Sequence, residues 1–225
     1  MAMVARPYEG LNSVSRLFSA EIEPSFFDAA KMEEYWGAHW GVNSEYGKLK
    51  AVYMHRPGEE LTTMTTKDYD SERDALIGEN YSYYWRGHEA PNIEKAQAQH
   101  DYFADVIRSY GAEVVYTKDN PIYLRKTVNT RDVAAAVPGG MIIMRLAPHM
   151  RRGEELVATR TLGGRGVPIL HTITGTGIME GGGVLVMDSH HVAVAHSHRC
   201  TQEGIDQLKM VLNPMDIEVI PIPVG

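Results

Sequence analysis

Four charged side chains recur in the sequence at a fixed spacing. Glu180 follows Asp132 by 48 residues, and Arg199 follows Arg151 by the same distance. A carboxylate at a strand end can bind a guanidinium through two parallel charge-assisted hydrogen bonds, and arginine forks can hold a carboxylate in the same way. Asp132 is therefore a candidate for binding a guanidinium, and Arg151 and Arg199 are candidates for binding a carboxylate.

Asp132 and the arginines also have a simpler interpretation. Asp132 could pair at the surface with Arg131, Arg125 or Lys126. The arginines could be solvated, although the helix dipole does not favour arginine at the first helical turn that the pattern predicts for Arg151 and Arg199.

Glu180 precedes three glycines, Gly181 to Gly183. Glycines permit close backbone approach at the entrance of a strand, and a carboxylate held there can orient a histidine and stabilise its charged form. The alternative is an exposed glutamate in a glycine-rich turn. No Lys-Ser/Thr follows the glycines, so a phosphate loop is not predicted.

One cysteine and a group of histidines are candidates for catalysis or metal binding. Cys200 follows an arginine at a predicted helix start, and both features lower a thiol pKa, but a small, partly buried residue is the simpler interpretation. His196 and His198 fall on one strand face and could serve a metal hydrolase. Zinc needs three or four convergent ligands, so ordinary turn and strand histidines are favoured. The four histidines of this group are His190, His191, His196 and His198.

The elements that would position these residues repeat as well. Alternation, helical periodicity and turn residues predict two units of strand, turn, strand, helix and strand. The first comprises 130–137, 141–146, 151–162 and 167–173; the second comprises 183–187, 191–196, 201–212 and 217–222. A strand at 48–55, a helix at Ile93–Tyr110 and a strand at 112–117 form a degenerate earlier unit, with Asn92 as helix cap. A fixed period of this size is typical of radial or solenoidal folds.

The pattern also predicts the domain organisation. Residues 1–46 form an N-terminal extension with a helix or two around Ser25–Phe27 and Tyr35–Trp40. Residues 47–225 form an incomplete α/β domain. The polar, aromatic segment 59–90 is long enough to be a lid or binding loop, or else a surface excursion packed by its own aromatic side chains.

Composition limits the class of protein. The 225 residues are 44% hydrophobic and 23% charged, with 22 Lys+Arg against 29 Asp+Glu and a net charge of -7. These values exclude a disordered or collagen-like chain and argue against nucleic acid or a membrane as partner. A single cysteine, no apolar run of membrane-spanning length and no apolar leader predict a cytoplasmic protein. A homo-oligomer is possible.

Residues 47–225 resemble the guanidino-group modifying (pentein) superfamily, which includes amidinotransferases, arginine deiminases and dimethylarginine dimethylaminohydrolases. The resemblance depends on the order and spacing of several short motifs. They are Gly47–Val52 with His55–Gly58, Asn129–Asp132, Pro138–Gly140, Arg151–Glu154, Glu180–Gly182 and Ser197–Arg199. It implies a five-bladed α/β propeller of ββαβ units, of which about three would be present, with the active site in the central channel.

The resemblance also implies roles. Asp132 would grip the guanidinium of an arginine or methylarginine-like substrate, Glu180 would support the catalytic histidine, and Arg151 and Arg199 would hold the substrate carboxylate. A cysteine thiolate would attack the guanidinium carbon and pass the amidino group to water or to an amine. No cofactor or metal is implied.

Two departures from the superfamily pattern bear on activity. Gly183 replaces an aspartate, and Cys200 stands where threonine is usual. The catalytic histidine and cysteine are expected beyond residue 225, so the chain resembles a truncated enzyme and is expected to be inactive alone. The alternative is a non-catalytic guanidino-compound binding module or pseudoenzyme.

Overall fold

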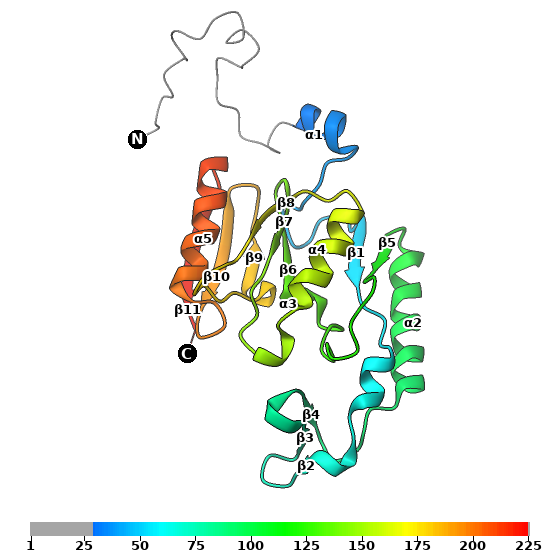
Figure 1. The fold of residues 1–225 in the computed structure, drawn as a ribbon. Helices are drawn as coiled ribbons and strands as arrows, with labels where there is room; N and C mark the ends of the chain where they lie inside the picture. Colours follow the sequence, from blue (N-terminus) through cyan, green and yellow to red (C-terminus); the bar gives the residue numbers. More distant parts are fainter. Residues whose placement is uncertain (1–28, 225) are drawn as a thin grey trace, which may run out of the picture.

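The structure is a computed structural model that describes residues 29–224. The aromatic patch Ser25–Phe27 lies outside the described residues. The second aromatic patch overlaps helix α1 (Ala29–Trp36). Figure 1 shows helices α5 and α2 on the two flanks of the molecule, with the strands and α4 between them.

Two successive units have the same strand order. Strand β6 (Ala134–Val137) pairs antiparallel with β7 (Gly140–Ile143), and β7 pairs parallel with β8 (Ile169–Thr172) after helix α4 (Glu154–Gly164). Parallel neighbours require such a crossover. In the second unit, β9 (Val184–Val186), β10 (His191–His196), α5 (Gln202–Leu212) and β11 (Glu218–Pro223) repeat this arrangement. Both ends of the two helices are displaced by 48 residues, so the predicted ββαβ repeat is confirmed for these units.

The earlier unit is incomplete, as the sequence predicts. Strand β1 (Ala51–Met54) pairs parallel with β5 (Glu113–Tyr116) after helix α2 (Ile93–Ser109), which forms a two-stranded sheet. The Asn92 side chain accepts a hydrogen bond from the Lys95 N–H at 2.8 Å and caps the helix. The unit thus has a middle strand and a parallel partner but no antiparallel hairpin partner within the described part of the chain.

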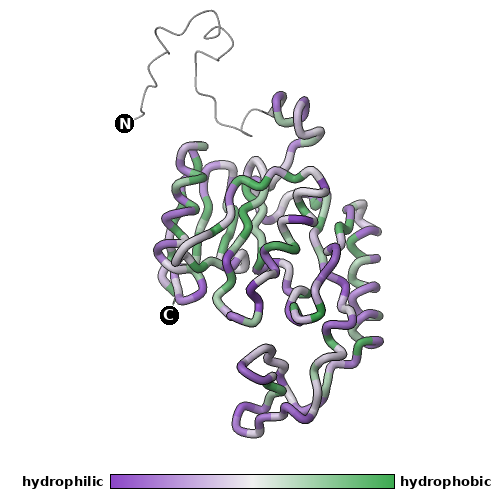
Figure 2. The backbone as a smooth tube through the Cα atoms, in the orientation of Figure 1, coloured by the Kyte–Doolittle hydropathy of each residue, from purple (hydrophilic) through white to green (hydrophobic). Residues whose placement is uncertain are grey.

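Residues 59–90 form a separate insert with a small sheet of their own. The insert contains η2 (Glu59–Thr63), η3 (Thr66–Asp68), β2 (Tyr69–Asp70), β3 (Ala75–Ile77), η4 (Glu79–Tyr81) and β4 (Tyr84–Arg86). Its core consists of Leu61, Met64, Leu76 and Tyr83, with Trp85 and Ala96 packed against it. It lies below the main sheets in Figure 1 and is mostly hydrophilic along the tube of Figure 2.

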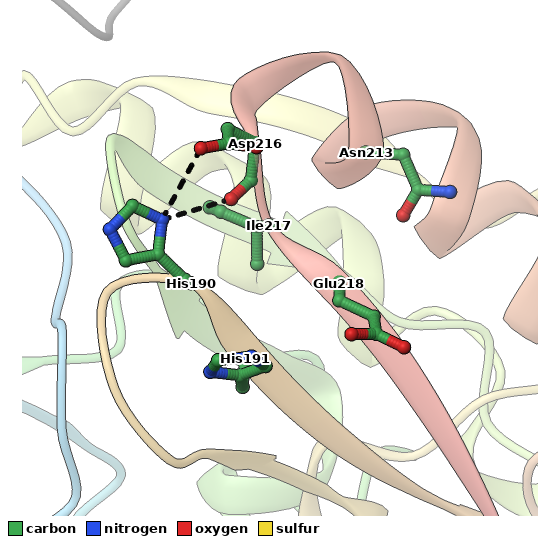
Figure 3. A pocket seen from close by; sticks show the side chains of 6 residues that line it. All are labelled: His190, His191, Asn213, Asp216, Ile217 and Glu218. Carbon is green, nitrogen blue, oxygen red and sulfur yellow. Dashed lines mark hydrogen bonds and ion pairs between the residues drawn. The ribbon is translucent and has the colours of Figure 1, made fainter.

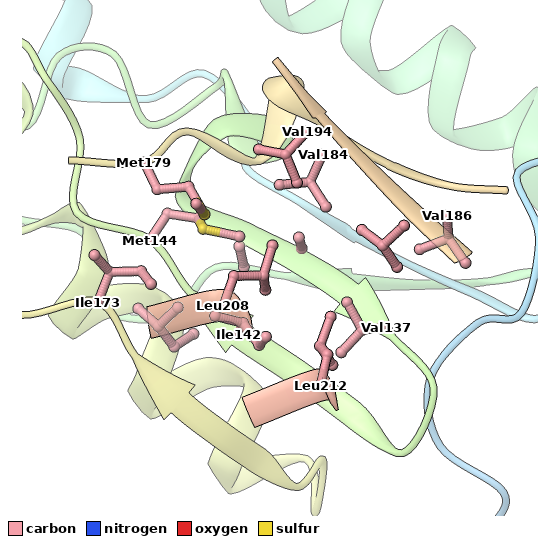
Figure 4. Close-up of a cluster of buried hydrophobic side chains, with 14 of the residues drawn as sticks. Val137, Ile142, Met144, Ile173, Met179, Val184, Val186, Val194, Leu208 and Leu212 are labelled. Atoms are coloured by element: carbon pink, nitrogen blue, oxygen red, sulfur yellow. The ribbon is translucent and has the colours of Figure 1, made fainter. Parts of the chain in front are cut away.

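The main core lies between the two complete units. Side chains from β6, β7, β9 and β10 and from the inner face of α5 pack together, as Figure 4 shows. Burial of each large aliphatic side chain contributes about 1.5–3 kcal/mol relative to leaving it exposed. The largest fully buried members include Ile142, Ile143, Met144, Leu146, Ile173, Met179, Ile205, Leu208, Leu212 and Ile217. The core therefore fixes the two units against each other.

Local structure differs from expectation at two places. Thr130–Val133 forms a helical turn (α3) instead of the first half of a strand, because the Thr130 hydroxyl donates to the Tyr53 carbonyl and the Asp132 N–H donates to the Asn129 carbonyl. The two arginines precede the helices and do not open them. Arg151 ends the short helix η5 (His149–Arg151), and Arg199 lies in a turn before α5.

The segment that leads into β1 contacts the main core. Trp40 packs against the core cluster, and the Glu45 carboxylate accepts a hydrogen bond from the Val186 N–H at 3.1 Å.

Among the helices of residues 29–224, none combines the length and apolar character needed to cross a bilayer.

Candidate functional site

Asp132 lies in the α3 turn and pairs with Arg151. Its Oδ2 atom accepts a hydrogen bond from Nη1 of Arg151 at 2.6 Å. Arg131, Arg125 and Lys126, the partners considered from the sequence, do not form ion pairs with Asp132. The aspartate side chain is 27% exposed, and its Oδ1 atom accepts no hydrogen bond from the part of the chain that the structure describes.

Arg151 is buried and almost completely hydrogen-bonded. Its Nε and Nη2 atoms donate to both oxygens of Glu154 at 2.9 and 2.8 Å, and Nη2 also donates to the Asn129 carbonyl at 3.0 Å. The Glu154 side chain is fully buried. Burial by itself lowers the pKa of Arg151, but the bonds to Glu154 and Asp132 outweigh burial and raise it. Arg151 therefore stays charged and holds Asp132 in place.

Glu180 and Arg199 form the equivalent pair in the next unit. Nη1 of Arg199 donates to Oε2 of Glu180 at 2.6 Å, and the Ala147 N–H donates to Oε1 at 3.2 Å. The carboxylate is buried, whereas the arginine side chain is 53% exposed. The alternative of an exposed glutamate is therefore wrong, and the exposed guanidinium is the more accessible of the two arginines.

The glycines after Glu180 bring the two pairs to the same region. A Cβ atom on Gly181 would lie 2.3 Å from the Arg131 carbonyl oxygen, and one on Gly182 would lie 2.9 Å from Oδ1 of Asp132. Position 181 therefore requires glycine, whereas a side chain at position 182 would displace the Asp132 carboxylate; the Glu180 loop packs directly onto the α3 turn. The structure places the four predicted residues as two neighbouring pairs, not on separate outer faces.

The two departures noted from the sequence contact each other. A Cβ atom on Gly183 would lie 2.6 Å from Sγ of Cys200, so a side chain at position 183 requires the cysteine to move. The thiol is buried and lies 3.6 Å from the Glu180 carbonyl oxygen. Burial raises the pKa of Cys200, which opposes thiolate formation. Cys200 is therefore a small core residue, more deeply buried than the partly buried residue that the sequence predicts.

The histidines do not form a metal centre in the structure. Residues 29–224 contain no group of three or more His, Cys, Asp or Glu side chains that could hold a metal ion. His190 and His191 line a shallow hollow with Asp216 and Glu218, shown in Figure 3. Nδ1 of His190 lies 3.1 Å from the Asp216 carbonyl oxygen, and these side chains are largely exposed. This hollow is formed at the start of β10, whereas Arg199 follows the end of β10 and Glu180 precedes β9.

Sequence reasoning missed two contributors to the site. Glu154, three residues after Arg151, was quoted only as part of a motif, although this spacing typically allows an ion pair. The contribution of the Ala147 N–H could not be predicted from the sequence, because almost every residue type has the same backbone N–H.

Comparison with solved structures shows the fold that this chain shares with other proteins. Dimethylarginine dimethylaminohydrolase from Pseudomonas aeruginosa, solved as a mutant complexed with citrulline, aligns with 80% of this chain and 62% of its own, at a TM-score of 0.60 and 18% identity. Inosamine-phosphate amidinotransferase from Streptomyces griseus aligns with 81% and 62%, at a TM-score of 0.56 and 12% identity. These similarities establish the fold, which is α/β with mixed sheets.

The sequence identifies the family more narrowly. A sequence model of the family described as "N,N dimethylarginine dimethylhydrolase, eukaryotic" matches residues 70–224. The chain therefore belongs to this family of the superfamily.

Curated relatives are arginine deiminases. The Treponema denticola enzyme is 40% identical over 186 residues, which is 77% of this chain and 36% of that protein. The Rhodococcus opacus enzyme is 33% identical over 118 residues, 49% of this chain and 26% of that protein. The chain thus spans about a quarter to a third of the length of these relatives. Because the relatives are enzymes, the non-catalytic alternative is not favoured.

Proposed function

We propose that this chain forms the substrate-binding part of a guanidine-modifying enzyme, which transfers or hydrolyses the amidino group of an arginine-like compound. The observation that carries the proposal is the repeated carboxylate–guanidinium pair, one in each complete ββαβ unit at the same 19-residue separation and the same 2.6 Å contact. Both carboxylates therefore already lie in a geometry that binds a guanidinium.

Asp132 is the group proposed to bind the substrate guanidinium. Arg151 occupies only Oδ2, which leaves Oδ1 as an acceptor on a partly exposed side chain. A second guanidinium N–H at Oδ1 would form a charge-assisted hydrogen bond. Arg199, which is half exposed, is proposed to bind the acidic end of the substrate.

Glu180 is proposed to support a catalytic histidine and not to bind substrate. Its two oxygens are occupied by Arg199 and by the Ala147 N–H, and the side chain is buried. A fixed, buried carboxylate can hold an imidazolium once Arg199 turns toward a substrate. Arg151 is reassigned from substrate carboxylate binding to holding Asp132, because its donors are already bonded within the protein.

The covalent step requires a thiolate that Cys200 does not supply, because this single cysteine is buried. We propose that the histidine and cysteine belong to a part of the enzyme outside this sequence.

The two complete units and the β1–β5 unit are proposed to be three blades of a five-bladed propeller, within the catalytic domain 47–225. A cytoplasmic location and homo-oligomerisation stay predictions from the sequence.

Calorimetric titration with arginine tests the binding function. Wild-type protein should bind arginine, and Asp132→Asn should lose at least about tenfold in affinity, since a charge-assisted bond contributes about 1.5–3 kcal/mol. Asp188→Asn is the matched control, because Asp188 is exposed and pairs with His191 at the far end of β10. Equal affinities of wild type and Asp132→Asn would reject the proposed role.

A further inference from the structure

Strand β9 lies at an edge of its sheet, and two side chains cover the outward-facing polar groups of that edge. Within the described residues β9 pairs with β10 alone. Nη2 of Arg131 donates to the Val184 carbonyl at 2.7 Å. The Val186 N–H donates to Oε1 of Glu45 at 3.1 Å. The two side chains therefore take the hydrogen-bonding place of a neighbouring strand, which an edge strand otherwise leaves open.

Arg131 and Glu45 also form an ion pair with each other. Nη2 of Arg131 lies 3.5 Å from Oε1 of Glu45, and both side chains are partly exposed. A surface ion pair by itself adds little stability. The side chains of Val184 and Val186 are buried in the main core, as Figure 4 shows, so the edge of β9 is a rigid support for this pair.

The segment before β1 brings Glu45 to this edge and is itself fixed at a second point. The Val42 N–H donates to the Val137 carbonyl, at the end of β6, at 3.3 Å. Gly41 has a φ of +96°, and a Cβ atom there would lie 2.0 Å from the same carbonyl oxygen. Residues 41–45 therefore contact both complete units, and Glu45 has a defined position beside β9.

Arg131 belongs to the α3 turn, in which three consecutive side chains bind three different units. The Thr130 hydroxyl donates to the Tyr53 carbonyl of β1 at 3.0 Å. Arg131 reaches β9 of the second complete unit, and Asp132 is held by Arg151 of its own unit. Since α3 is a single turn of 4 residues, a shift of Arg131 moves Asp132 with it.

We propose that Arg131 and Glu45 are positioning residues for Asp132. Their contacts with the edge of β9 hold the α3 turn against the second complete unit, and thereby fix the direction of the Oδ1 atom of Asp132. The inference rests on the proposed function of Asp132. It deepens that function by naming two residues that act through this carboxylate, one of them in the segment before β1.

A double-mutant cycle with arginine as ligand tests the inference, by calorimetry and NMR titration. Arg131→Met keeps an unbranched stem but removes the bonds to β9 and to Glu45, and it should weaken arginine binding about three- to tenfold. In an Asp132→Asn background the same substitution should change the affinity less than about twofold. A general loss of structure would instead weaken binding by the same factor in both backgrounds.

Further variants separate positioning from a loss of fold. Arg131→Lys keeps a cationic donor and should recover part of the affinity that Arg131→Met loses. Arg73→Met is the matched control, because Arg73 is similarly exposed and pairs with Asp70 in the insert, and it should leave arginine affinity unchanged. Thermal melting checks each fold. Should Arg131→Met fail to fold, Glu45→Gln keeps an acceptor for the Val186 N–H and should show a smaller loss in the same direction.

Amide hydrogen exchange tests the edge contact without a ligand. The Val186 N–H should exchange slowly in wild type and at least about tenfold faster in Glu45→Ala, because an open strand edge leaves this N–H to water. The N–H groups of β10, which has a partner strand on both sides, should keep their rates. Exchange of the Val186 N–H in wild type at the rate of an open chain would overturn the inference.

The binding outcomes distinguish this inference from the proposed function. If Arg131→Met binds arginine as tightly as wild type, or loses the same factor in both backgrounds, the positioning role is refuted while guanidine binding on Asp132 stands. If the wild-type chain does not bind arginine at millimolar concentration, the proposed function fails and the inference fails with it. A loss that occurs only while Asp132 is intact supports both.

Discussion

At the scale of single residues, the site contains two carboxylate–arginine pairs that look alike in sequence but differ in burial. Arg151 is buried against a fully buried Glu154, whereas Arg199 is half exposed. The sequence predicted all four residues but did not indicate which of the two arginines is the more buried. Burial depends on how α3 and α4 pack together, and residue spacing does not encode it.

Replacement of Arg151 should be costly for stability. Arg151→Met leaves Glu154 buried without its partner, and breaking a buried pair typically costs about 3–5 kcal/mol. The control Arg165→Met breaks the exposed pair with Glu113 and should cost about 0–1 kcal/mol. Urea unfolding monitored by circular dichroism measures both. A similar loss in the two variants would show that Arg151 is not the buried anchor described above.

Glu60 should contribute a pH-dependent part of the stability. Burial tends to raise the pKa of Glu60, but bonds from His55 at 3.0 Å and from the Gly58 N–H at 2.8 Å outweigh burial, so the pKa is lowered. A carboxyl group with a lowered folded-state pKa stabilises the protein above its ordinary value of 4.5. This stability is lost as the pH falls through the lower folded-state pKa.

Glu60→Gln should therefore reduce the dependence of the free energy of unfolding on pH in the acid range. The free energy of unfolding, measured by urea titration from pH 7 to pH 3, should fall less steeply below pH 4.5 in this variant than in wild type. Glu89→Gln, at an exposed glutamate in the segment before α2, is the control and should keep nearly the wild-type slope. An unchanged slope in Glu60→Gln would contradict the assignment.

At the scale of elements, the glycine-rich entrance to β9 joins the two units. Gly181 lies so close to the α3 turn that a Cβ atom would meet the backbone oxygens of Arg131 and Ala134 at 2.3 and 2.8 Å. The sequence correctly indicated close backbone approach here from three consecutive glycines. It missed the α3 turn itself, because the β-branched residues Thr130, Val133 and Val137 favour a strand, and the bonds from the Thr130 hydroxyl to β1 and from the Asp132 N–H to the Asn129 carbonyl override that preference.

Substitution of glycine by alanine should have opposite effects at two positions. Gly181→Ala forces two backbone segments apart and should destabilise the protein by about 1–3 kcal/mol and weaken arginine binding, since Asp132 lies in the turn that moves. Gly163→Ala, in the exposed last turn of α4 with open space around it, should stabilise by about 0.5–1 kcal/mol. Thermal melting and calorimetry measure both effects. A neutral Gly181→Ala would show that the loop is not held against α3.

At the scale of the whole molecule, the repeat predicted most of the architecture. The period of 48 residues located both complete units and their helices, because turn residues and apolar periodicity recur at that distance. The insert could not be placed in the same way. Its contacts through Trp85 and Arg125 join segments far apart in sequence, and nothing local in 59–90 specifies where it docks.

The central claim is that the unoccupied oxygen of Asp132 binds a substrate guanidinium between the two units. A crystal structure of this chain with bound arginine tests it most directly. We predict the ligand guanidinium at hydrogen-bond distance from Oδ1 of Asp132, with Arg151 still paired to Glu154 and the ligand carboxylate toward Arg199. Arginine bound elsewhere, such as in the hollow beside His190, with Asp132 uncontacted, would contradict it.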